Sequence, residues 1–195
     1  MYKEILKPFL DKSFIVITAP IIIPLIIVIS ILIALFDGFP IFFIQERPGK
    51  NLKIFRLIKF RTMLPKNISV HTESITKLGS VLRRTSLDEI PSFFNVLVGD
   101  MSLIGPRPLL KEYINSYDQN QIKRHNVAPG LTGLAQIMGR NKVSWKERFN
   151  YDLDYVNEIN LALDIKIFVK TLFLLFNKDI INQDNNTTMK RFDEE

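Results

Sequence analysis

The first candidates for chemistry are two adjacent carboxylates, Asp88 and Glu89, which lie between Arg84 and Arg107 in the chain. A carboxylate can attack phosphorus and form a covalent aspartyl-phosphate intermediate. Arginine can bind phosphate through two parallel N–H donors, so flanking arginines could hold the group under attack. The segment therefore predicts a phosphate-handling site with Asp88 as the candidate nucleophile.

A purely structural role also fits these acids. Ser86-Leu87-Asp88-Glu89 matches the capping box S-x-x-E, in which Ser86 would cap a helix and Glu89 would reach back to its N–H. Adjacent helical residues point about 100° apart, so Asp88 and Glu89 should not share a face. One acid could therefore cap or bind a metal while the other points into a cleft.

Two further segments favour a phosphate site. Arg107 stands between two prolines in LIGPRPL, which indicates a guanidinium held in place by a rigid turn. The glycine-rich stretch APGLTGLAQIMGR, residues 128–140, is predicted to be a loop that ends at Arg140, and such loops can cradle phosphates. A divalent metal would be needed to offset the repulsion between a carboxylate and a phosphate.

The elements that must position these residues follow from local patterns. Residues 41–60 predict a β-hairpin with its turn at Pro48-Gly49, and Lys59 and Arg61 should share one strand face. A polar loop is expected over 65–73. Helices are expected over 74–84, from Pro108 through residue 125, from the capping box SWKE at 144–147, and over 160–177. The last of these is strongly apolar, so it is either a core helix or, as we favour, a helix on a membrane surface.

Residues 14–36 form an uncharged apolar run, longer than the roughly 18–20 residues that suggest a membrane helix. Basic residues flank the run on both sides, and the positive-inside rule places basic flanks in the cytoplasm. Pro20 and Pro24 lie within the run and can break a helix. A re-entrant helix, which leaves on the side it entered, satisfies both flanks, and a kinked ordinary span is the alternative.

Composition narrows the class of partner. The 195 residues suffice for one domain with a sizeable core, and 47% of them are hydrophobic. The net charge of +6 indicates an anionic partner such as a phospholipid, a nucleotide or a nucleic acid. Cysteine is absent, which excludes disulfides and thiol nucleophiles and fits a cytosolic setting. His71 and His125 lack metal-ligand spacing, so a histidine-based metal site is not expected.

Taken together, these motifs resemble the bacterial sugar transferases that begin glycan assembly on a polyprenol carrier, the monotopic phosphoglycosyl transferases. The likeness covers nearly the whole chain, and the length is similar to the minimal catalytic form of the family. It is carried by RPG (47–49), KFRTM (59–63), SLDE (86–89), FNVLVGDMSLIGPRPLL (94–110), PGLTGLAQIMGR (129–140) and YDLDYV (151–156).

The resemblance implies transfer of a phospho-sugar from a UDP-sugar to undecaprenyl phosphate, release of UMP, and Mg²⁺ as the cofactor. Asp88 would be the nucleophile, Glu89 would assist with the metal or the proton, and both are candidate metal ligands. The family's N-terminal helix is re-entrant with both ends cytoplasmic, although here Ala19-Pro20 and Ile23-Pro24 replace its Ser-Pro pair. Phosphate contacts are expected from Arg107, Arg140, Arg83, Lys59 and Arg61.

We therefore expect a mostly helical α+β fold in three parts. These are a membrane-anchoring re-entrant helix (1–37), a catalytic domain with a small β-hairpin and amphipathic surface helices (38–181), and a flexible tail (182–195). The catalytic domain should lie at the cytoplasmic face of the bacterial inner membrane. Membrane lipid and the two substrates are expected partners, downstream glycosyltransferases are possible ones, and nucleic acid is not expected.

Two rival functions stay open. The first is direct metal-dependent transfer, in which Asp88 and Glu89 only bind Mg²⁺ and no covalent intermediate forms. The second is a non-catalytic membrane scaffold that recruits glycan enzymes through its basic surface.

Overall fold

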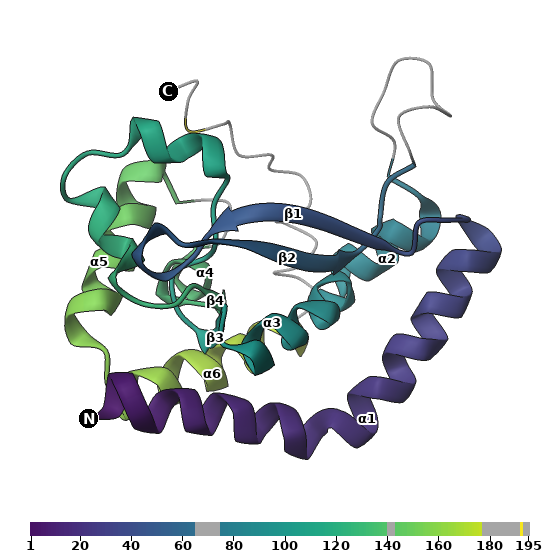
Figure 1. The fold of residues 1–195 in the computed structure, drawn as a ribbon, viewed down its shortest axis with the longest axis horizontal. Coiled ribbons are helices and arrows are strands. Elements are labelled where there is room, and N and C mark those ends of the chain that lie inside the picture. The colour runs from purple at the N-terminus through teal and green to yellow at the C-terminus, as the bar shows by residue number, and fades with distance from the viewer. Residues whose placement is uncertain (65–74, 140–142, 177–191, 193–195) are drawn as a thin grey trace.

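The computed structural model describes residues 1–64, 75–139, 143–176 and 192. The predicted loop over 65–73, Arg140 and all of the predicted tail except Phe192 lie outside the described residues. The fold is α+β and mostly helical, as expected, with two small two-stranded sheets among the described elements. Figure 1 shows the N-terminal helix passing along one side of the molecule and rising at its far end.

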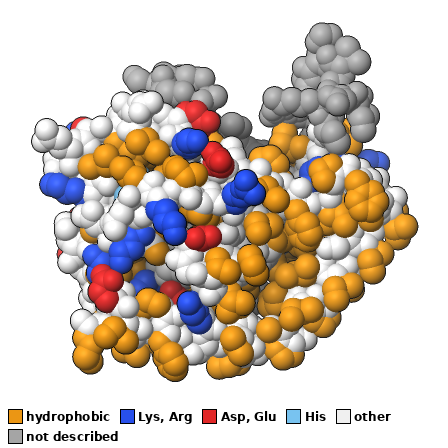
Figure 2. All heavy atoms as spheres, in the orientation of Figure 1, with side chains coloured by type: hydrophobic (Ala, Val, Ile, Leu, Met, Phe, Trp, Pro, Cys, Tyr) orange, Lys and Arg blue, Asp and Glu red, His pale blue; other side chains and the backbone are white. Residues whose placement is uncertain are grey.

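One π-helical turn (Tyr2–Leu6) leads into this long helix, α1 (Lys7–Phe36). Together they form the one helix of the described chain that is long and apolar enough to cross a membrane. Its most apolar stretch has a mean hydropathy of 3.0, yet only 11% of that stretch is buried in the protein. Figure 2 shows the exposed hydrophobic side chains gathered along the outer side of α1. An apolar patch of this kind is typical of a surface that binds a membrane or another protein.

Helix α1 is bent into two arms, and both arms pack on the same domain (Figure 1). In the first arm, Ile15 packs in a core cluster with Phe55 and Leu57 of the β-hairpin. In the second arm, Ile33 packs in another cluster with Phe60 and Leu82. Pro20 and Pro24 both lie between these contacts, and proline is a common cause of a sharp helix bend. The expected break is therefore a bend in one continuous helix, because each proline removes only one N–H donor.

The start of α1 is fixed by a buried polar cluster. The Asp164 carboxylate accepts hydrogen bonds from Tyr2 Oη at 2.5 Å, Lys7 Nζ at 2.7 Å and Tyr155 Oη at 2.8 Å. Nearby, Ser102 Oγ donates to the Asp11 carboxylate at 2.6 Å. These contacts tie the first turns of α1 to the carboxyl-terminal helices.

The end of α1 is fixed by one arginine. The Arg61 guanidinium donates to the carbonyls of Asp37 at 2.7 Å, Gly38 at 2.6 Å and Pro40 at 2.5 Å. Since the first turns are also held, both ends of the apolar helix are attached to the same domain.

The predicted hairpin is confirmed. Strands β1 (Phe42–Pro48) and β2 (Ile54–Phe60) pair antiparallel, with Phe42 opposite Phe60 and Pro48 opposite Ile54. The 3₁₀ helix η2 (Lys50–Leu52) forms the turn after Pro48-Gly49. The other edge of β2 bonds to side chains: Ser92 Oγ donates to the Ile58 carbonyl at 2.7 Å, and Asn95 accepts from the Ile58 N–H at 3.2 Å.

These two bonds dock the segment that carries the acidic pair. The segment forms the 3₁₀ helix η3 (Leu87–Ser92) followed by α3 (Phe93–Val98), and it ends at Gly99, which has a φ of 92°. A left-handed glycine after the last helical residue is a common helix end, so the predicted stop at Gly99 is confirmed. Because η3 lies along β2, Glu89 is brought next to Lys59.

The remaining elements agree only partly with expectation. Helices α2 (Lys77–Arg84), α5 (Trp145–Glu158) and α6 (Leu161–Phe176) are confirmed, and Ser144 and Glu147 form the predicted capping box at the start of α5. The helix predicted from Pro108 is wrong. It is replaced by two 3₁₀ helices, η4 (Lys111–Ser116) and η5 (Gln121–Asn126), because the Asp118 carboxylate binds the N–H groups of Asn120 and Gln121 in a local turn.

The loop predicted over 128–140 is also wrong in part. It contains strand β4 (Gly130–Thr132), which pairs parallel with β3 (Ser102–Ile104), and helix α4 (Leu134–Met138). A Cβ on Gly130 would lie 2.1 Å from the Gly105 nitrogen, so the glycine here permits close backbone pairing.

Helix α6 has two unlike faces. Ile167 on one face is fully buried against β3, α4 and α5. The opposite face exposes an apolar stripe made of Leu161, Ile165, Val169, Leu172 and Phe173. Helix α6 therefore has the exposed apolar side that a helix on a membrane surface requires, and its location at a membrane stays a prediction.

Candidate active site

The acidic pair does not form a capping box. Ser86 adopts a left-handed conformation with φ of 56°, and its side chain makes no cap hydrogen bond. An N-cap residue needs an extended backbone instead, so the Ser86 hydroxyl is turned away from the N–H groups it would cap. The Glu89 carboxylate points elsewhere, and the structural reading of SLDE is thus wrong.

Glu89 binds two cations instead. Its carboxylate accepts a bidentate contact from the Arg107 guanidinium, at 2.5 and 3.3 Å, and a bond from Lys59 Nζ at 2.6 Å. Burial acts to raise the pKa of Glu89, but the charges of Arg107 and Lys59 outweigh it and lower the pKa to about 2. Glu89 is therefore a permanent anion that holds Arg107 and Lys59 together.

Asp88, unlike Glu89, is not bound by these cations. Among the described residues, its carboxylate takes part in no hydrogen bond and no ion pair. Burial raises the pKa of Asp88, and the neighbouring Glu89 carboxylate raises it further, while Lys59, Arg107 and Arg83 act against them. An unpaired, partly desolvated carboxylate beside cations is what a nucleophile toward an anionic phosphate requires.

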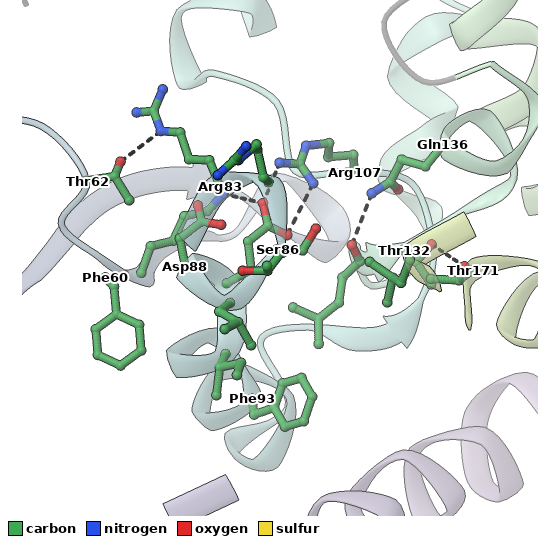
Figure 3. Close-up of a pocket in the computed structure, with 18 of the residues that line it drawn as sticks. Phe60, Thr62, Arg83, Ser86, Asp88, Phe93, Arg107, Thr132, Gln136 and Thr171 are labelled. Carbon is green, nitrogen blue, oxygen red and sulfur yellow. Dashed lines mark hydrogen bonds and ion pairs between the residues drawn. The ribbon is translucent and has the colours of Figure 1, made fainter. Parts of the chain in front are cut away.

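Asp88 and Glu89 line a cavity of about 1210 Å³ whose walls differ in character (Figure 3). One wall is polar and carries the acids together with Lys59, Arg83 and Arg107. The other is apolar and comes from two apolar helices, with Ile22 and Leu25 of α1 and Phe168, Leu172 and Leu175 of α6. A molecule with a charged head and a hydrocarbon chain fits such a cavity.

The structure brings together three of the five predicted phosphate ligands. Lys59 and Arg107 meet at Glu89, and Arg83 reaches the same cavity while its Nε donates to Thr62 Oγ1 at 2.8 Å (Figure 3). Arg61 also lines the cavity, but its guanidinium is bonded to the carbonyls at the end of α1 and that of Met63. Arg140 lies outside the described residues.

Other cavity residues were not singled out by sequence reasoning. Asp152, Arg148 and Gln136 line the cavity, as do Thr132 and Thr171, whose hydroxyls share a 2.8 Å hydrogen bond (Figure 3). Asp152 falls within the motif YDLDYV, and its spacing from buried Phe149 and Tyr155 on α5 was the signal that it faces inward. Its partner Arg124 is 28 residues away, so no local pattern links the two.

Asp88 and Glu89 are the predicted metal ligands, and their carboxylates differ in how free they are to bind a metal ion. No group of three His, Asp or Glu side chains within the described residues is placed to hold a metal. Mg²⁺ in phosphate-handling sites commonly binds one or two carboxylates together with substrate phosphate oxygens, so two acids are not too few. Asp88 offers an unpaired carboxylate that fits this use, whereas Glu89 is already occupied by Lys59 and Arg107.

The chain is similar to known sugar transferases and exopolysaccharide proteins. The family model described as "Bacterial sugar transferase" matches residues 2–178. The sugar transferase EpsL of Bacillus subtilis is 44% identical over 160 residues, which are 80% of this chain and 79% of EpsL. The exopolysaccharide production protein ExoY of Rhizobium meliloti is 35% identical over 187 residues, or 83% of each chain.

One longer relative has a name that states its donor and its acceptor. The UDP-glucose:undecaprenyl-phosphate glucose-1-phosphate transferase of Xanthomonas campestris pv. campestris is 37% identical over 186 residues. The match covers 87% of this chain but only 38% of that protein. The chain therefore spans most of EpsL and ExoY and the smaller part of the Xanthomonas enzyme.

Proposed function

The chain belongs to the bacterial sugar transferase family, and from this premise we propose that it transfers a sugar 1-phosphate from a UDP-sugar to undecaprenyl phosphate, the first step of a glycan. One observation carries the proposal. A single cavity joins an unpaired carboxylate and a group of cations to a wall made by two apolar helices. A soluble diphosphate and a lipid phosphate could both reach that place.

In the first step, an Asp88 carboxylate oxygen attacks the sugar-linked phosphorus of the donor. The bond from that phosphorus to the bridging oxygen breaks, UMP leaves, and the phospho-sugar stays on Asp88 as a mixed anhydride. Lys59, Arg83 and Arg107 stand on the cavity wall where they can stabilise charge on the phosphate oxygens. The Glu89 carboxylate fixes Arg107 and Lys59 before the substrate binds.

In the second step, a phosphate oxygen of undecaprenyl phosphate attacks the same phosphorus. The bond to Asp88 breaks, the carboxylate is regenerated, and the product is a lipid-linked diphosphate sugar. Leu25, Phe168 and Leu172 on the apolar wall would contact the first part of the hydrocarbon chain. The head group would then be at the level of Asp88.

Mg²⁺ would be held by the Asp88 carboxylate and the donor phosphates, and when bound it neutralises charge that would otherwise repel the nucleophile. The residues that surround the site act with it: Arg107 and Lys59 bind the phosphate oxygens and Glu89 keeps both cations oriented.

We place the protein on the cytoplasmic face of the bacterial inner membrane through a re-entrant α1. Asp164 holds the start of α1 and Arg61 holds its end, so a domain on one side of a bilayer retains both ends. The apolar stripe of α6 would lie at the same membrane surface. Basic flanks on both sides of the apolar run support the cytoplasmic side.

The test is UMP release by the purified protein in detergent or nanodiscs, with undecaprenyl phosphate, Mg²⁺ and a panel of UDP-sugars. We expect release with at least one donor and a phospho-sugar adduct on Asp88 when undecaprenyl phosphate is omitted. Asp88→Asn should abolish both, whereas Asp100→Asn, a nearby acid outside the cavity lining, should keep both.

Two results would contradict the proposal. Release of UMP without any adduct, together with measurable Asp88→Asn activity, would indicate direct metal-dependent transfer. No release with any donor, together with normal glycan production by cells carrying Asp88→Ala, would indicate a scaffold.

A further inference from the structure

We propose that Arg124, oriented by Asp152, is a positioning residue that holds the Arg107 loop against Glu89. The inference rests on the proposed function because it concerns the same site. Neither Arg124 nor Asp152 is expected to bind the reacting phosphorus. Their effect would pass through the backbone of Arg107.

The loop that carries Arg107 has the sequence Pro106-Arg107-Pro108. Proline has no N–H, so this loop lacks two of the donors that normally let a turn bond to itself. The structure supplies donors from outside to three successive carbonyls. Gly130 N–H donates to the Pro106 carbonyl at 3.0 Å, Arg124 Nη2 to that of Arg107 at 2.6 Å, and Arg47 Nη1 to that of Pro108 at 3.4 Å.

Arg124 makes the shortest of these three bonds, and it is itself fixed. Its Nε and Nη2 both donate to one oxygen of Asp152, at 2.9 and 2.7 Å, and the side chains are only 2% and 3% exposed. The guanidinium also lies over the Phe149 ring, 5.9 Å from its centre. Such a buried charge has one stable place, so the donor to the Arg107 carbonyl cannot shift freely.

Arg107 needs this support because its own side chain is less constrained. The Arg107 side chain is 37% exposed, and within the described residues it is bonded to the Glu89 carboxylate. A shift of the loop would therefore move the guanidinium relative to Glu89 and to a bound phosphate. Misplacement of a catalytic group by about 1 Å can reduce a rate about 100-fold.

The Arg124–Asp152 pair also lies between two parts of the chain. Arg124 belongs to η5, and Asp152 belongs to α5, whose start is fixed by the Ser144–Glu147 capping box. Asp152 lines the main cavity as well. The pair thus connects the helix that borders the cavity to the loop that presents its main phosphate ligand.

The test is a double-mutant cycle on kcat/KM for UMP release, with Asp152→Asn and Arg107→Ala alone and together. We expect Asp152→Asn alone to lower kcat/KM about 10- to 100-fold, mostly through kcat. In the Arg107→Ala background the same change should have an effect of about threefold or less, because the group it positions is gone. An equal loss in both backgrounds would overturn the proposal, since Asp152 would then act independently of Arg107.

Arg124→Lys is the second variant in case Asp152→Asn fails to fold. Lysine keeps a buried charge for Asp152 but removes the second N–H that reaches the Arg107 carbonyl, and it should show the same dependence on Arg107. The matched control is Glu46→Gln, which breaks the exposed Lys111–Glu46 pair beside the same loop. It should leave kcat/KM within about twofold of the wild-type value.

A readout without activity separates this inference from the proposed function. If the wild-type protein releases no UMP with any donor, the proposed function fails and the cycle is run on melting temperature, with Asp152→Asn and Glu89→Gln. If Asp152 holds Arg107 on Glu89, the two shifts in melting temperature will not add. Additive shifts would overturn the inference whether or not the protein is active.

Discussion

Asp164→Asn should destabilise the protein far more than the loss of one surface ion pair, because Asp164 is the centre of the cluster that holds the start of α1. The carboxylate accepts from Tyr2, Lys7 and Tyr155, and its side chain is 6% exposed while that of Lys7 is 9% exposed. An amide of the same shape has no charge and a single oxygen acceptor. It would take the directly bonded counter-charge from the buried Lys7 ammonium, and its NH₂ group would face one of the donors that the carboxylate now accepts.

The expected loss of stability follows from the burial of this ion pair. Removing one partner of a buried ion pair costs about 3–5 kcal/mol, because the remaining charge stays desolvated. For a domain of this size, 1 kcal/mol corresponds to a shift of about 2–4 °C in melting temperature. We therefore expect Asp164→Asn to melt about 10 °C below the wild-type protein in the same detergent, as followed by circular dichroism.

A matched control is available in the same region. Glu4 pairs with Lys50 at 3.0 Å and also ties the start of the chain to the domain, but the two side chains are 60% and 43% exposed. Glu4→Gln should leave the melting temperature unchanged within error, because solvent screens such pairs. Limited trypsin digestion gives a second measurement, since cleavage after Lys12, in the second turn of α1, should increase only in Asp164→Asn, where the start of the helix is no longer held. If Asp164→Asn melts and digests like the wild-type protein, the cluster does not hold α1 and the reasoning is refuted.

Three further predictions concern the site and its supports. If Asp88 is the nucleophile we propose, it attacks only when ionised, and because its pKa is raised, kcat/KM should fall with decreasing pH around a pKa above the ordinary 3.8 of aspartate. Glu89→Gln removes the adjacent negative charge, so the acid limb of its residual activity should move to lower pH, and a shift to higher pH would contradict this account. Gly79→Ala should lower the melting temperature by several degrees and reduce activity, because its Cβ would lie 2.2 Å from the Thr62 carbonyl oxygen, whereas Ser80→Ala on the same helix should do neither. Ser144→Ala should lower the melting temperature by about 2–4 °C through loss of the cap on α5, and an unchanged melting curve would show that α5 does not depend on it.

The parts of the fold that were predictable are those with a short-range cause. Pro48-Gly49 indicated the hairpin turn, Ser144 and Glu147 indicated the start of α5, and Gly99 indicated the end of α3. The uncharged apolar run likewise indicated the long helix α1. Each of these signals lies within a few residues of the feature that it predicts.

The parts that were missed depend on contacts between distant segments. Strands β3 and β4 have three residues each, too few for a periodic signal, and they form because Gly130 lets their backbones approach. The alternation along β2 predicted that Lys59 and Arg61 share a face, and both line the cavity, but it could not show that the carbonyls of Asp37, Gly38 and Pro40 would occupy the Arg61 guanidinium. Long-range pairing decided those outcomes.

The difference between local signals and long-range contacts also explains what the sequence indicated about Asp88 and Glu89. Sequence reasoning named Asp88 as the candidate nucleophile but left the task of Glu89 open, because both readings of SLDE used only local geometry. The answer depends on Lys59, 30 positions from Glu89, and Arg107, 18 positions away, which both bind Glu89 and leave Asp88 unpaired.

Their opposite pKa shifts follow from that arrangement. Glu89, with a pKa of about 2, stays ionised through the working range and cannot exchange a proton usefully there. Asp88, whose pKa is raised by burial and by Glu89, has the higher-energy and less stabilised carboxylate. When environments push two neighbouring acids apart in this way, the paired acid organises the site and the unpaired acid reacts. Exchanging the two, as Asp88→Glu with Glu89→Asp, should therefore leave the acid at position 89 bound to Lys59 and Arg107 and the acid at position 88 unpaired, so a phospho-sugar adduct should still form at position 88, because the two cations recognise the position and not the residue type.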